Sequence, residues 1–450
     1  MIERTIEQIA QYCNGQMNQA AKLQKDQSIK GVSIDTRTLE AGNLFVPFKG
    51  ENVDGHRFID MAIKKGAALT LTEEENSEVN IPAIIVKDGL KALQDISRAY
   101  LQEVGPKVVA VTGSNGKTTT KDMIECVLSK RYKVQKTQGN FNNEIGLPLT
   151  ILQLDEDTEV SILEMGMDKR GDIDFLSTLT KPDIAVVTSV GESHIEMLGS
   201  RESIALAKYE IVNGLKNEGT FIYSKDYPLL EQIVDNKVDY SIKSAGLDNS
   251  NDDQVTEVRA DGEGTRFKFK GKNFKISQLG AHNALNASLA ILVGETLGVS
   301  LEESKENLED LSVTSMRMER IQDESGALII NDAYNASKAS MISAIDTVGR
   351  LKHQERILVL ADILELGDYK EVLHVDVANF INSTPYDFAM IYTFGESSKY
   401  IHNALKTNNK VHFDSIEELR RSVREHFNAD TVILLKGSRG MALERVLTDS

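Results

Sequence analysis

The chain has 450 residues, with 51 Lys and Arg against 68 Asp and Glu, so its formal net charge is −17. Because most domains hold about 100 to 200 residues, this length predicts two or three domains. The composition, 41% hydrophobic and 26% charged with only 7 Pro, excludes a disordered or collagen-like chain. The negative charge repels polyanions, which argues against a protein that binds nucleic acid or an anionic membrane.

The expected location is the cytoplasm. The start, MIERTIEQIA, lacks the basic and apolar regions of a signal peptide, and no stretch approaches the roughly 18 apolar residues of a membrane span. Cys13 and Cys126 are the only cysteines, too few for a disulfide framework or a thiolate metal site. We therefore expect no membrane insertion, and nothing in the sequence implies an oligomer.

A first domain boundary is predicted near residue 103. The segment LQEVGP (101–106) places a Gly-Pro break between an amphipathic, helix-like stretch and the apolar run 108–111. Beyond this break, short β-branched runs alternate with helix-length stretches, which predicts a parallel sheet with helices on its faces. The predicted strands are 160–163, 184–188 and 220–223, and a typical helical stretch is 204–216.

The second domain is expected to end with a helix over 282–297, because its apolar residues share one face and Gly298 follows. The polar patch GLDNSNDDQ (246–254) is interpreted as a surface loop. After residue 312, four more apolar runs are typical of buried parallel strands and predict a third, Rossmann-like unit. These runs are 327–330, 356–360, 389–393 and 431–435.

The sharpest local pattern is VVAVTGSNGKTTT (108–120), an apolar strand followed by Gly113, Gly116, Lys117 and Thr118 and then a helical stretch, 121–130. Such glycines let backbone N–H groups surround phosphate oxygens, the lysine reaches the outer phosphates, and the threonine hydroxyl can ligate Mg²⁺. Val111 stands where the usual loop has its first glycine, so the loop is a variant. ATP or GTP binding is therefore predicted; the alternative is a tight turn with a solvated lysine.

The segment TGSNGKTTTKD (112–122) resembles the nucleotide loop of the Mur ligases, ATP-dependent amide-forming enzymes that build the peptide of the bacterial cell wall. Further motifs similar to that family follow in the family's order. They are DTRTLEAGNLFVPFKGENVDGH (35–56), GNFNNEIGLPLT (139–150), LEMGMDKRGDI (163–173), GESHIEMLGS (191–200), AKYEI (207–211), HNALNASLAI (282–291), NDAYNAS (331–337), LELGD (364–368) and LKGSRGM (435–441).

Within the family, NDAYNAS and LKGSRGM favour a member that adds D-alanyl-D-alanine to UDP-N-acetylmuramoyl-tripeptide over the sister that adds diaminopimelate or lysine. The resemblance implies that ATP first phosphorylates the tripeptide carboxylate, after which the dipeptide amine displaces phosphate. It also implies an α/β fold of three domains: a smaller UDP-substrate domain (1–103), a central P-loop-type parallel-sheet domain that binds ATP (104–312), and a Rossmann-like domain (313–450). This last domain is expected to bind the dipeptide and to close on ATP from an open resting form.

Phosphoryl transfer needs positioned charges more than covalent chemistry from the protein. The resemblance implies that Thr118 and Glu164 hold Mg²⁺ and that His194 ligates a second Mg²⁺. It also implies that CO₂ carbamylates Lys208, turning a cation into an anion that helps to place the metal and the substrate. The alternatives are a turn-capping Glu164, an ordinary His194 and a Lys208 on a solvated helix face. With Lys117 and Arg317, His194 and Lys208 are the expected catalytic residues.

The remaining site residues also follow from the resemblance. Asn283 and Asn286 are expected at the adenine, with N-capping by Asn283 as the alternative, and Arg317 and Asp332 reach the γ-phosphate and ribose from the third domain. The expected ATP-binding set is Gly113, Ser114, Asn115, Gly116, Lys117, Thr118, Thr119, His282, Asn283, Asn286, Arg317 and Asp332.

Two groups of residues are expected to bind the other substrates. For the UDP-linked acceptor they are Ser33, Asp35, Arg37, His56, Asn140, Asn142 and Asn143. For D-alanyl-D-alanine they are Tyr334, Asn335, Lys436, Ser438 and Arg439, with either Lys436 or Arg439 pairing with the dipeptide carboxylate. Two other kinds of function stay open: another Mur-type ligase or a folylpolyglutamate synthetase, or a nucleotide-binding regulator without catalysis.

Overall fold

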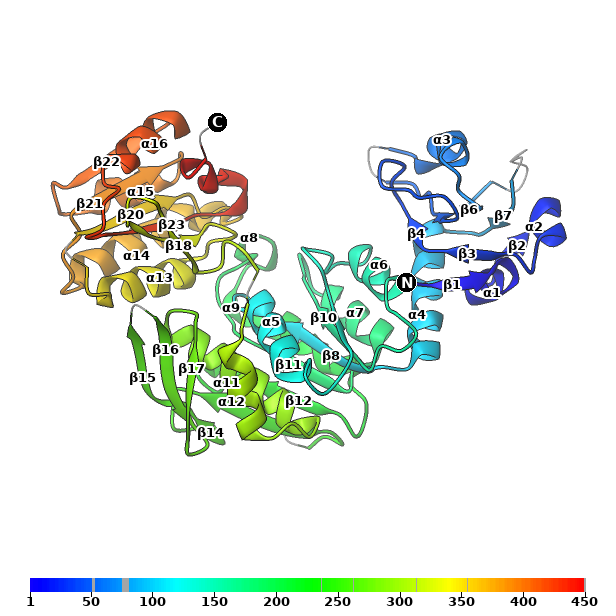
Figure 1. Cartoon of the computed structure of the whole chain (residues 1–450), viewed down its shortest axis with the longest axis horizontal. Helices are drawn as coiled ribbons and strands as arrows, with labels where there is room; N and C mark the ends of the chain where they lie inside the picture. The colour runs from blue at the N-terminus through cyan, green and yellow to red at the C-terminus, as the bar shows by residue number, and fades with distance from the viewer. Residues whose placement is uncertain are drawn as a thin grey trace.

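The computed structural model describes residues 1–50, 53–74, 81–235, 237–261, 263–312, 314–353 and 355–448. The chain forms three α/β regions, each built around its own sheet, with the first and third at opposite ends and the central one between them (Figure 1). Below, the first region is residues 1–104, the central region 105–312 and the third region 314–448. Val313, where the third domain is expected to begin, lies outside the described residues.

The first region contains a five-stranded sheet in the order β2-β7-β6-β5-β4 and a small β1-β3 pair. Helix α4 connects it to the central region: Asp88 caps its start, Leu93, Ile96 and Tyr100 form its buried face, and Gly105 ends it at a left-handed φ of 64°. The Gly-Pro break therefore ends a helix, as expected. The elements are β1 (Glu3–Thr5), α1 (Ile6–Tyr12), β2 (Gln16–Met17), α2 (Gln19–Leu23), β3 (Ser28–Lys30), β4 (Val32–Ser33), β5 (Leu44–Phe45), η1 (Gly55–Phe58), α3 (Ile59–Lys64), β6 (Leu69–Thr72), β7 (Ala83–Ile85) and α4 (Gly89–Val104).

The central region has a seven-stranded, wholly parallel sheet in the order β14-β13-β12-β11-β8-β10-β9. Its middle strands are buried on both faces, which explains their continuous apolar sequence. The elements are β8 (Lys107–Thr112), α5 (Lys117–Leu128), β9 (Val134–Lys136), α6 (Gly146–Leu152), β10 (Val160–Glu164), α7 (Asp172–Thr180), β11 (Ile184–Val187), α8 (Ile195–Leu198), α9 (Arg201–Tyr209), η2 (Glu210–Gly214), β12 (Thr220–Tyr223), α10 (Pro228–Glu231), β13 (Ser241–Gly246), β14 (Asp253–Gln254), β15 (Thr256–Asp261), β16 (Gly264–Phe269), β17 (Lys272–Ile276), α11 (Ala281–Thr296) and α12 (Leu301–Glu309).

The central region departs from the sequence prediction in four places. The stretch 204–216 is not one helix, because α9 gives way to a 3-10 turn at Glu210. The patch 246–254 is only partly a surface loop. Asn251 is buried and its Nδ2 donates to Asp226 Oδ1, and β14 pairs with β13. Helix α11 does not end the region, because α12 follows and Asn307 donates to the carbonyl of Val127 on α5 at 2.8 Å.

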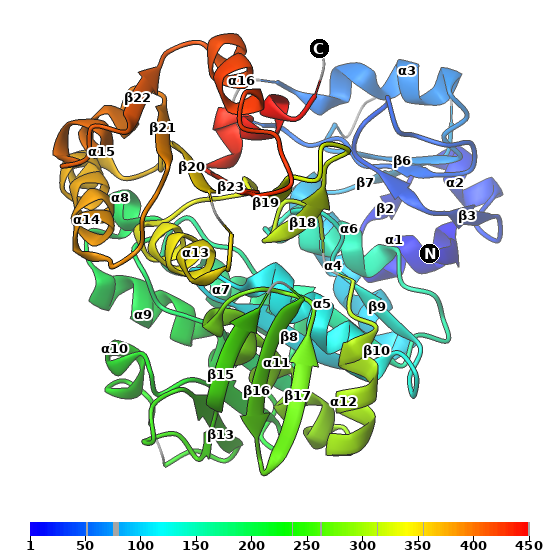
Figure 2. The same ribbon diagram turned by 60° about the vertical axis from the view of Figure 1, so that its left-hand side comes forward.

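The fourth departure is an antiparallel sheet, β15-β16-β17, which the sequence analysis missed. Its phenylalanines Phe267, Phe269 and Phe274 pack in one core with α11. Figure 2 shows this sheet as a separate layer beside the parallel sheet. The alternation TRFKFKGKNFKI, with a Lys-Gly turn, is the signal that predicts such a hairpin.

The third region has a six-stranded sheet in the order β18-β19-β23-β20-β21-β22, parallel except for β18. All four predicted runs form strands, so the Rossmann-like expectation and the mixed α/β fold are confirmed. The elements are β18 (Glu319–Gln322), β19 (Leu328–Asp332), α13 (Lys338–Arg350), β20 (Glu355–Ala361), η3 (Gly367–Tyr369), α14 (Lys370–Ser383), β21 (Met390–Phe394), α15 (Ser398–Ala404), β22 (Lys410–Phe413), α16 (Ile416–Arg424), β23 (Thr431–Lys436), η4 (Arg439–Met441) and η5 (Leu443–Val446). Among the described residues, no helix is both long and apolar enough to span a membrane.

Candidate active site

The phosphate loop lies between β8 and α5, at the carboxyl edge of the central parallel sheet. Gly116 adopts a left-handed φ of 81° at the start of α5, and a Cβ there would come within 2.6 Å of the Asn286 side chain. Lys117 donates to the carbonyl oxygen of Gly113 at 2.7 Å. The loop therefore turns its lysine and the N-terminus of α5 inward, as phosphate binding requires.

Neighbouring residues hold this loop in place. The hydroxyl of Ser114 accepts from the backbone N–H of Gly191 at 2.8 Å, and the N–H of Asn115 donates to Ser189 Oγ at 2.8 Å. Both partners follow β11, the strand next to β8. The loop is thus built from two adjacent strand ends, where ligands of open α/β sheets usually bind.

Glu164 ends β10 and is buried beside the loop. Its Oε2 accepts from Thr118 Oγ1 at 2.9 Å, and its Oε1 accepts from Asn142 Nδ2 at 3.1 Å. Burial alone would raise the pKa of Glu164, but the positive charges of Lys121, Lys117 and Arg317 outweigh it and hold the pKa below its usual value. Glu164 is therefore an anion at neutral pH rather than a turn cap.

Lys121 is a residue that the sequence analysis missed. It is fully buried on α5, lies 3.4 Å from Glu164 Oε2 and donates to the carbonyl of Thr137 at 2.8 Å. Lys121 follows Lys117 by four residues, so both lysines lie on one face of the helix. This spacing is the pattern in the sequence that indicates a second positive charge in the site.

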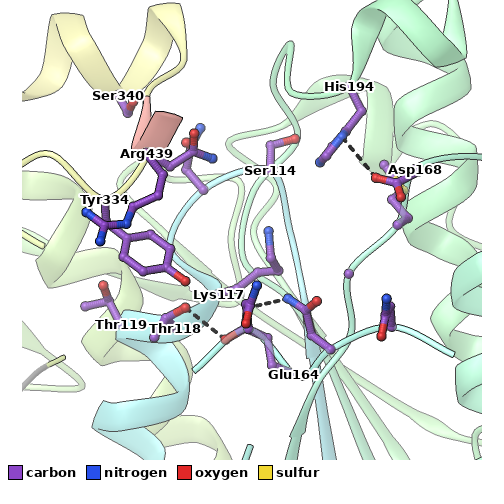
Figure 3. Close-up of a pocket in the computed structure, with 18 of the residues that line it drawn as sticks. Ser114, Lys117, Thr118, Thr119, Glu164, Asp168, His194, Tyr334, Ser340 and Arg439 are labelled. Atoms are coloured by element: carbon purple, nitrogen blue, oxygen red, sulfur yellow. Dashed lines mark hydrogen bonds and ion pairs between the residues drawn. The ribbon is translucent and has the colours of Figure 1, made fainter. Parts of the chain in front are cut away.

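The central and third regions, with Gln94 of the first region, line a cavity of about 960 Å³. Figure 3 shows Tyr334, Ser340 and Arg439 on one side, His194 and Asp168 on the other, and Lys117 and Glu164 between them. Of the expected site residues, the cavity is lined by Ser114, Asn115, Gly116, Lys117, Thr118, Thr119, Asn140, Asn142, Asn143, Glu164, His194, His282, Asn283, Asn286, Arg317, Asp332, Tyr334, Asn335, Lys436 and Arg439. Those that do not line it are Ser33, Asp35, Arg37, His56, Gly113, Lys208 and Ser438.

His194 is the N-cap residue of α8 and has a left-handed φ of 64°. Its Nδ1 lies 3.3 Å from Glu365 Oε2 and 3.7 Å from Asp168 Oδ1. Burial, together with the charge of Lys117, lowers the pKa of His194 to about 4. The imidazole is therefore neutral at pH 7 and has a lone pair available for a metal ion. In the part of the chain that is described, no three His, Cys, Asp or Glu side chains group as a metal site.

Lys208 is buried on α9, so its interpretation as a solvated surface lysine is wrong. Burial and then the charge of Lys117 lower the pKa of Lys208 well below its usual value. Its Nζ lies 4.0 Å from Met167 Sδ. The neutral amine is thus strongly favoured at this position.

Asn283 and Asn286 lie in the first turns of α11 and form a short chain of hydrogen bonds. Asn283 Nδ2 donates to the carbonyl of Leu279 at 2.8 Å, and Asn286 Nδ2 donates to Asn283 Oδ1 at 3.0 Å. The residue that caps the helix is Gly280, so N-capping by Asn283 is wrong. Asn286 Oδ1 faces the phosphate loop, close to Gly116.

Arg317 and Asp332 reach the cavity from the third region. The Arg317 guanidinium lies over the Tyr334 ring at 4.1 Å, and its Nε has no hydrogen-bond partner among the described residues. Asp332 Oδ2 pairs with Lys436 at 2.7 Å, and Lys436 also donates to the carbonyl of Asn335 at 2.7 Å. Lys436 is therefore already engaged. Arg439 pairs with Glu444 through Nη1, and its side chain is 54% exposed.

The first region's expected residues make local contacts away from the cavity. Asp35 forms an ion pair with Arg37, and Ser33 Oγ donates to the carbonyl of Asp35 at 2.9 Å. His56 Nδ1 lies 2.7 Å from Asp54 Oδ1, and its Nε2 accepts from the N–H of Glu73 at 3.1 Å. Both His56 nitrogens are therefore used within the fold.

Two further expected residues also have structural contacts. Asn143 Oδ1 accepts from the N–H of Gly146 at 2.8 Å, at the start of α6. Ser438 Oγ accepts from the N–H of Leu364 at 3.0 Å, between two loops of the third region. These contacts position loops of the cavity wall.

Three sequence profiles match consecutive parts of the chain: "Mur ligase family, catalytic domain" at residues 28–101, "Mur ligase middle domain" at 111–294, and "Mur ligase, glutamate ligase domain" at 316–439. The curated UDP-N-acetylmuramoyl-tripeptide--D-alanyl-D-alanine ligase of Bacillus subtilis is 46% identical over 459 residues, covering 100% of this chain and 98% of that protein.

Solved structures agree with these matches. The crystal structure of MurF from Acinetobacter baumannii superposes with a TM-score of 0.90 at 26% identity, covering 100% of this chain and 99% of that one. The MurF ligase of Thermotoga maritima in complex with ADP has a TM-score of 0.84 at 28% identity, covering 93% and 96%. With its phosphate loop, its buried glutamate and this full-length similarity, the chain belongs to the Mur ligase family.

Proposed function

We propose that the protein joins D-alanyl-D-alanine to the terminal carboxylate of UDP-N-acetylmuramoyl-tripeptide in peptidoglycan synthesis, using ATP and releasing ADP and phosphate. The observation that carries this proposal is the shared cavity, where Lys117 and Glu164 of the central region meet Arg317 and Asp332 of the third. The name and full-length similarity of the Bacillus subtilis relative support the substrates. The ADP complex of the Thermotoga maritima relative supports the nucleotide.

The chemistry divides between activation and attack. ATP transfers its γ-phosphoryl group to the tripeptide carboxylate, and the dipeptide amine then forms the amide and expels phosphate. Lys117 and Arg317 supply positive charge where the transferred group gains negative charge, and a cavity closed by two regions keeps water from the acyl phosphate. Asn283 and Asn286 carry the polar groups for the adenine, and Asp332 those for the ribose.

Magnesium is also part of the proposal. Thr118 Oγ1 and Glu164 Oε2 lie 2.9 Å apart at the phosphate loop, which fits a cation that takes one or two protein oxygens and completes its shell with phosphate and water. Bound there, Mg²⁺ would neutralise the β- and γ-phosphates. The neutral His194 imidazole is the proposed ligand of a second ion.

We also propose that Lys208 is carbamylated, and its burial supports this proposal. The amine nitrogen attacks CO₂, a C–N bond forms, and one proton leaves, so that a neutral amine becomes an anionic carbamate. The lowered pKa of Lys208 supplies the neutral amine that this step needs. The anion would then offset the positive charge of Lys117.

The three regions correspond to proposed domains with separate tasks. Residues 1–103 are proposed to bind the UDP moiety through Ser33, Asp35, Arg37 and His56, residues 104–312 to bind ATP, and residues 313–450 to bind the dipeptide. Three residues of the central region line the large cavity and are proposed to contact the acceptor: Asn140, Asn142 and Asn143. We place the reaction in the cytoplasm.

Phosphate release tests the function. The purified protein should release phosphate from ATP and form the ligated product only when the tripeptide acceptor and D-alanyl-D-alanine are both present. Lys117→Ala should lose this activity at least about 10²-fold while keeping its circular dichroism spectrum, because it removes a transition-state charge. Product formation with glutamate as the amine would favour a folylpolyglutamate synthetase, and nucleotide binding without any product would favour a regulator.

A further inference from the structure

A second, smaller cavity of about 110 Å³ adjoins the large one at the seam between the central and third regions. Its walls are the loop 192–194 and three loops of the third region, 335–337, 363–366 and 438–440. His194, Asn335, Glu365 and Arg439 line both cavities. A molecule in the smaller cavity therefore lies next to the place where the acyl phosphate forms.

Two carboxylates line this smaller cavity, and they differ in their partners. Glu192 is buried and has cations nearby, with Lys338 at 3.4 Å and Arg201 at 3.8 Å from its Oε1. The Glu365 side chain is 69% exposed, and its ion-pair partner in the described part of the chain is His194. Among the described residues, no lysine or arginine lies at ion-pair distance from the Glu365 carboxylate.

The backbone around Glu365 is held in an uncommon conformation. Glu365 has a left-handed φ of 61°, which costs energy for a residue with a side chain. Two hydrogen bonds fix the loop: His374 Nε2 accepts from the N–H of Ile363 at 3.1 Å, and Ser438 Oγ accepts from the N–H of Leu364 at 3.0 Å. These contacts hold the Glu365 carboxylate at this point of the cavity wall despite the energetic cost of its backbone conformation.

The same cavity offers a cation and an apolar surface. Arg439 Nη1 contacts Glu444, which leaves further N–H donors of the guanidinium for a second carboxylate. Ala336, Ile363 and Leu366 supply apolar contacts. A carboxylate, a guanidinium and small apolar groups together match a short zwitterion with methyl side chains. A nucleotide phosphate does not match, because Glu365 would repel it.

We propose that this smaller cavity receives the incoming dipeptide, with Glu365 pairing with its ammonium group and Arg439 with its carboxylate. The inference rests on the proposed function and names the residues that select the amine substrate. Glu365 then holds the amine at the boundary with the large cavity, on the side of His194.

The test compares Glu365→Gln with Glu371→Gln, an exposed glutamate of the same region that lines neither cavity. Loss of a charge-assisted hydrogen bond should raise the KM for D-alanyl-D-alanine roughly 10- to 100-fold in Glu365→Gln, and Glu371→Gln should match wild type. The KM values for ATP and for the tripeptide acceptor should stay within about twofold of wild type. Hydroxylamine trapping of the acyl phosphate, which needs no dipeptide, should also be unchanged.

Propionyl-D-alanine, which has hydrogen in place of the ammonium group, provides a second readout. As a competitive inhibitor of wild type, its Ki should exceed the KM of the dipeptide about tenfold or more. The same Ki should hardly change in Glu365→Gln, because no ammonium is there to lose its partner. This measurement on wild type keeps the test decisive even if the variant folds poorly.

Three results would overturn the inference alone: an unchanged dipeptide KM in Glu365→Gln, an equal rise in the Ki of propionyl-D-alanine, or a matching loss of acyl-phosphate trapping. The last two would show that Glu365 shapes the cavity or acts through His194. A wild-type protein that makes no product at all would instead overturn the proposed function, and the inference with it.

Discussion

Lys208 shows how strongly the surroundings of one residue decide its chemistry. It lies in a helix whose sequence, AKYEI, would suit a solvated lysine, yet its ammonium group would be buried near a second cation, Lys117. Within the described residues, no carboxylate lies at ion-pair distance from it. A buried amine in this setting is stable when neutral or when converted to an anion.

The carbamate predicts a chemical rescue. Lys208→Ala should lose most of its activity, and added acetate or formate should restore part of it, because a short carboxylate can occupy the place of the missing anion. Initial rates with increasing carboxylate, with chloride at equal ionic strength as the control, measure this. Rescue by a short amine instead would show that Lys208 acts as a cation.

Other expected ligands turn out to be residues that hold the fold together. His56 bonds Asp54 and Glu73, and Lys436 bonds Asp332 and Asn335. A side chain whose polar atoms are already hydrogen-bonded can still border a ligand, but it has fewer free donors for that ligand. Arg439 pairs with Glu444 through Nη1 alone, and its guanidinium keeps further N–H donors, so it is the better placed partner for a carboxylate.

At the scale of elements, α11 and α13 meet at a half-buried histidine. His282 Nδ1 lies 2.7 Å from Ser343 Oγ, and burial lowers the pKa of His282 to about 4 from an ordinary value of 6.5. Because the folded pKa is the lower one, the stability from the neutral form is present above pH 6.5 and is lost as the pH falls toward 4. Between pH 8 and pH 5 this group should cost about 2 kcal/mol of stability.

Calorimetry of wild type and His282→Asn at both pH values checks this contact. The Tm of wild type should fall more between pH 8 and pH 5 than the Tm of the variant, whose amide can keep the bond to Ser343 without titrating. Equal falls in Tm would mean that His282 titrates alike in the folded and unfolded chain.

At the scale of the whole molecule, polar contacts join the central and third regions around the cavity. Asp122 Oδ2 accepts from the N–H and hydroxyl of Thr314 at 2.9 and 2.8 Å, Ser337 Oγ donates to Asn115 Oδ1 at 3.1 Å, and Lys338 pairs with Glu192. The structure therefore has the two regions in contact, whereas the sequence predicts an open resting form. Polar contacts between domains break more readily than apolar ones, so opening stays a prediction.

Lys338→Met should favour the open form, because it removes the cation opposite Glu192. Without ligand its radius of gyration in small-angle scattering should exceed that of wild type, and a non-hydrolysable ATP analogue with acceptor should bring both to the same value. The KM for ATP should rise about two- to fivefold. Lys406→Met, an exposed lysine of the same region, is the control, and identical scattering of all three proteins would contradict the closure.

The sequence by itself determined the parts of this protein that depend on neighbouring residues along the chain. Buried parallel strands need continuous apolar runs, so β8, β10, β11 and β12 were predictable, as were β19, β20, β21 and β23 of the third region. The phosphate loop was predictable too, because its glycines, lysine and threonine lie within six residues. The shared order of short motifs also determined the family, because it extends over nearly the whole chain.

Only the tertiary structure decided which side chains face one another. Lys121 lies against Glu164, Lys436 pairs with Asp332, and Glu365 reaches His194, although these partners are separated by 43 to 171 positions in the sequence. Such pairs depend on how sheets and loops pack, and no local pattern carries that information. The burial of Lys208, which sets its pKa, is decided in the same way, because desolvation comes from residues distant in the chain.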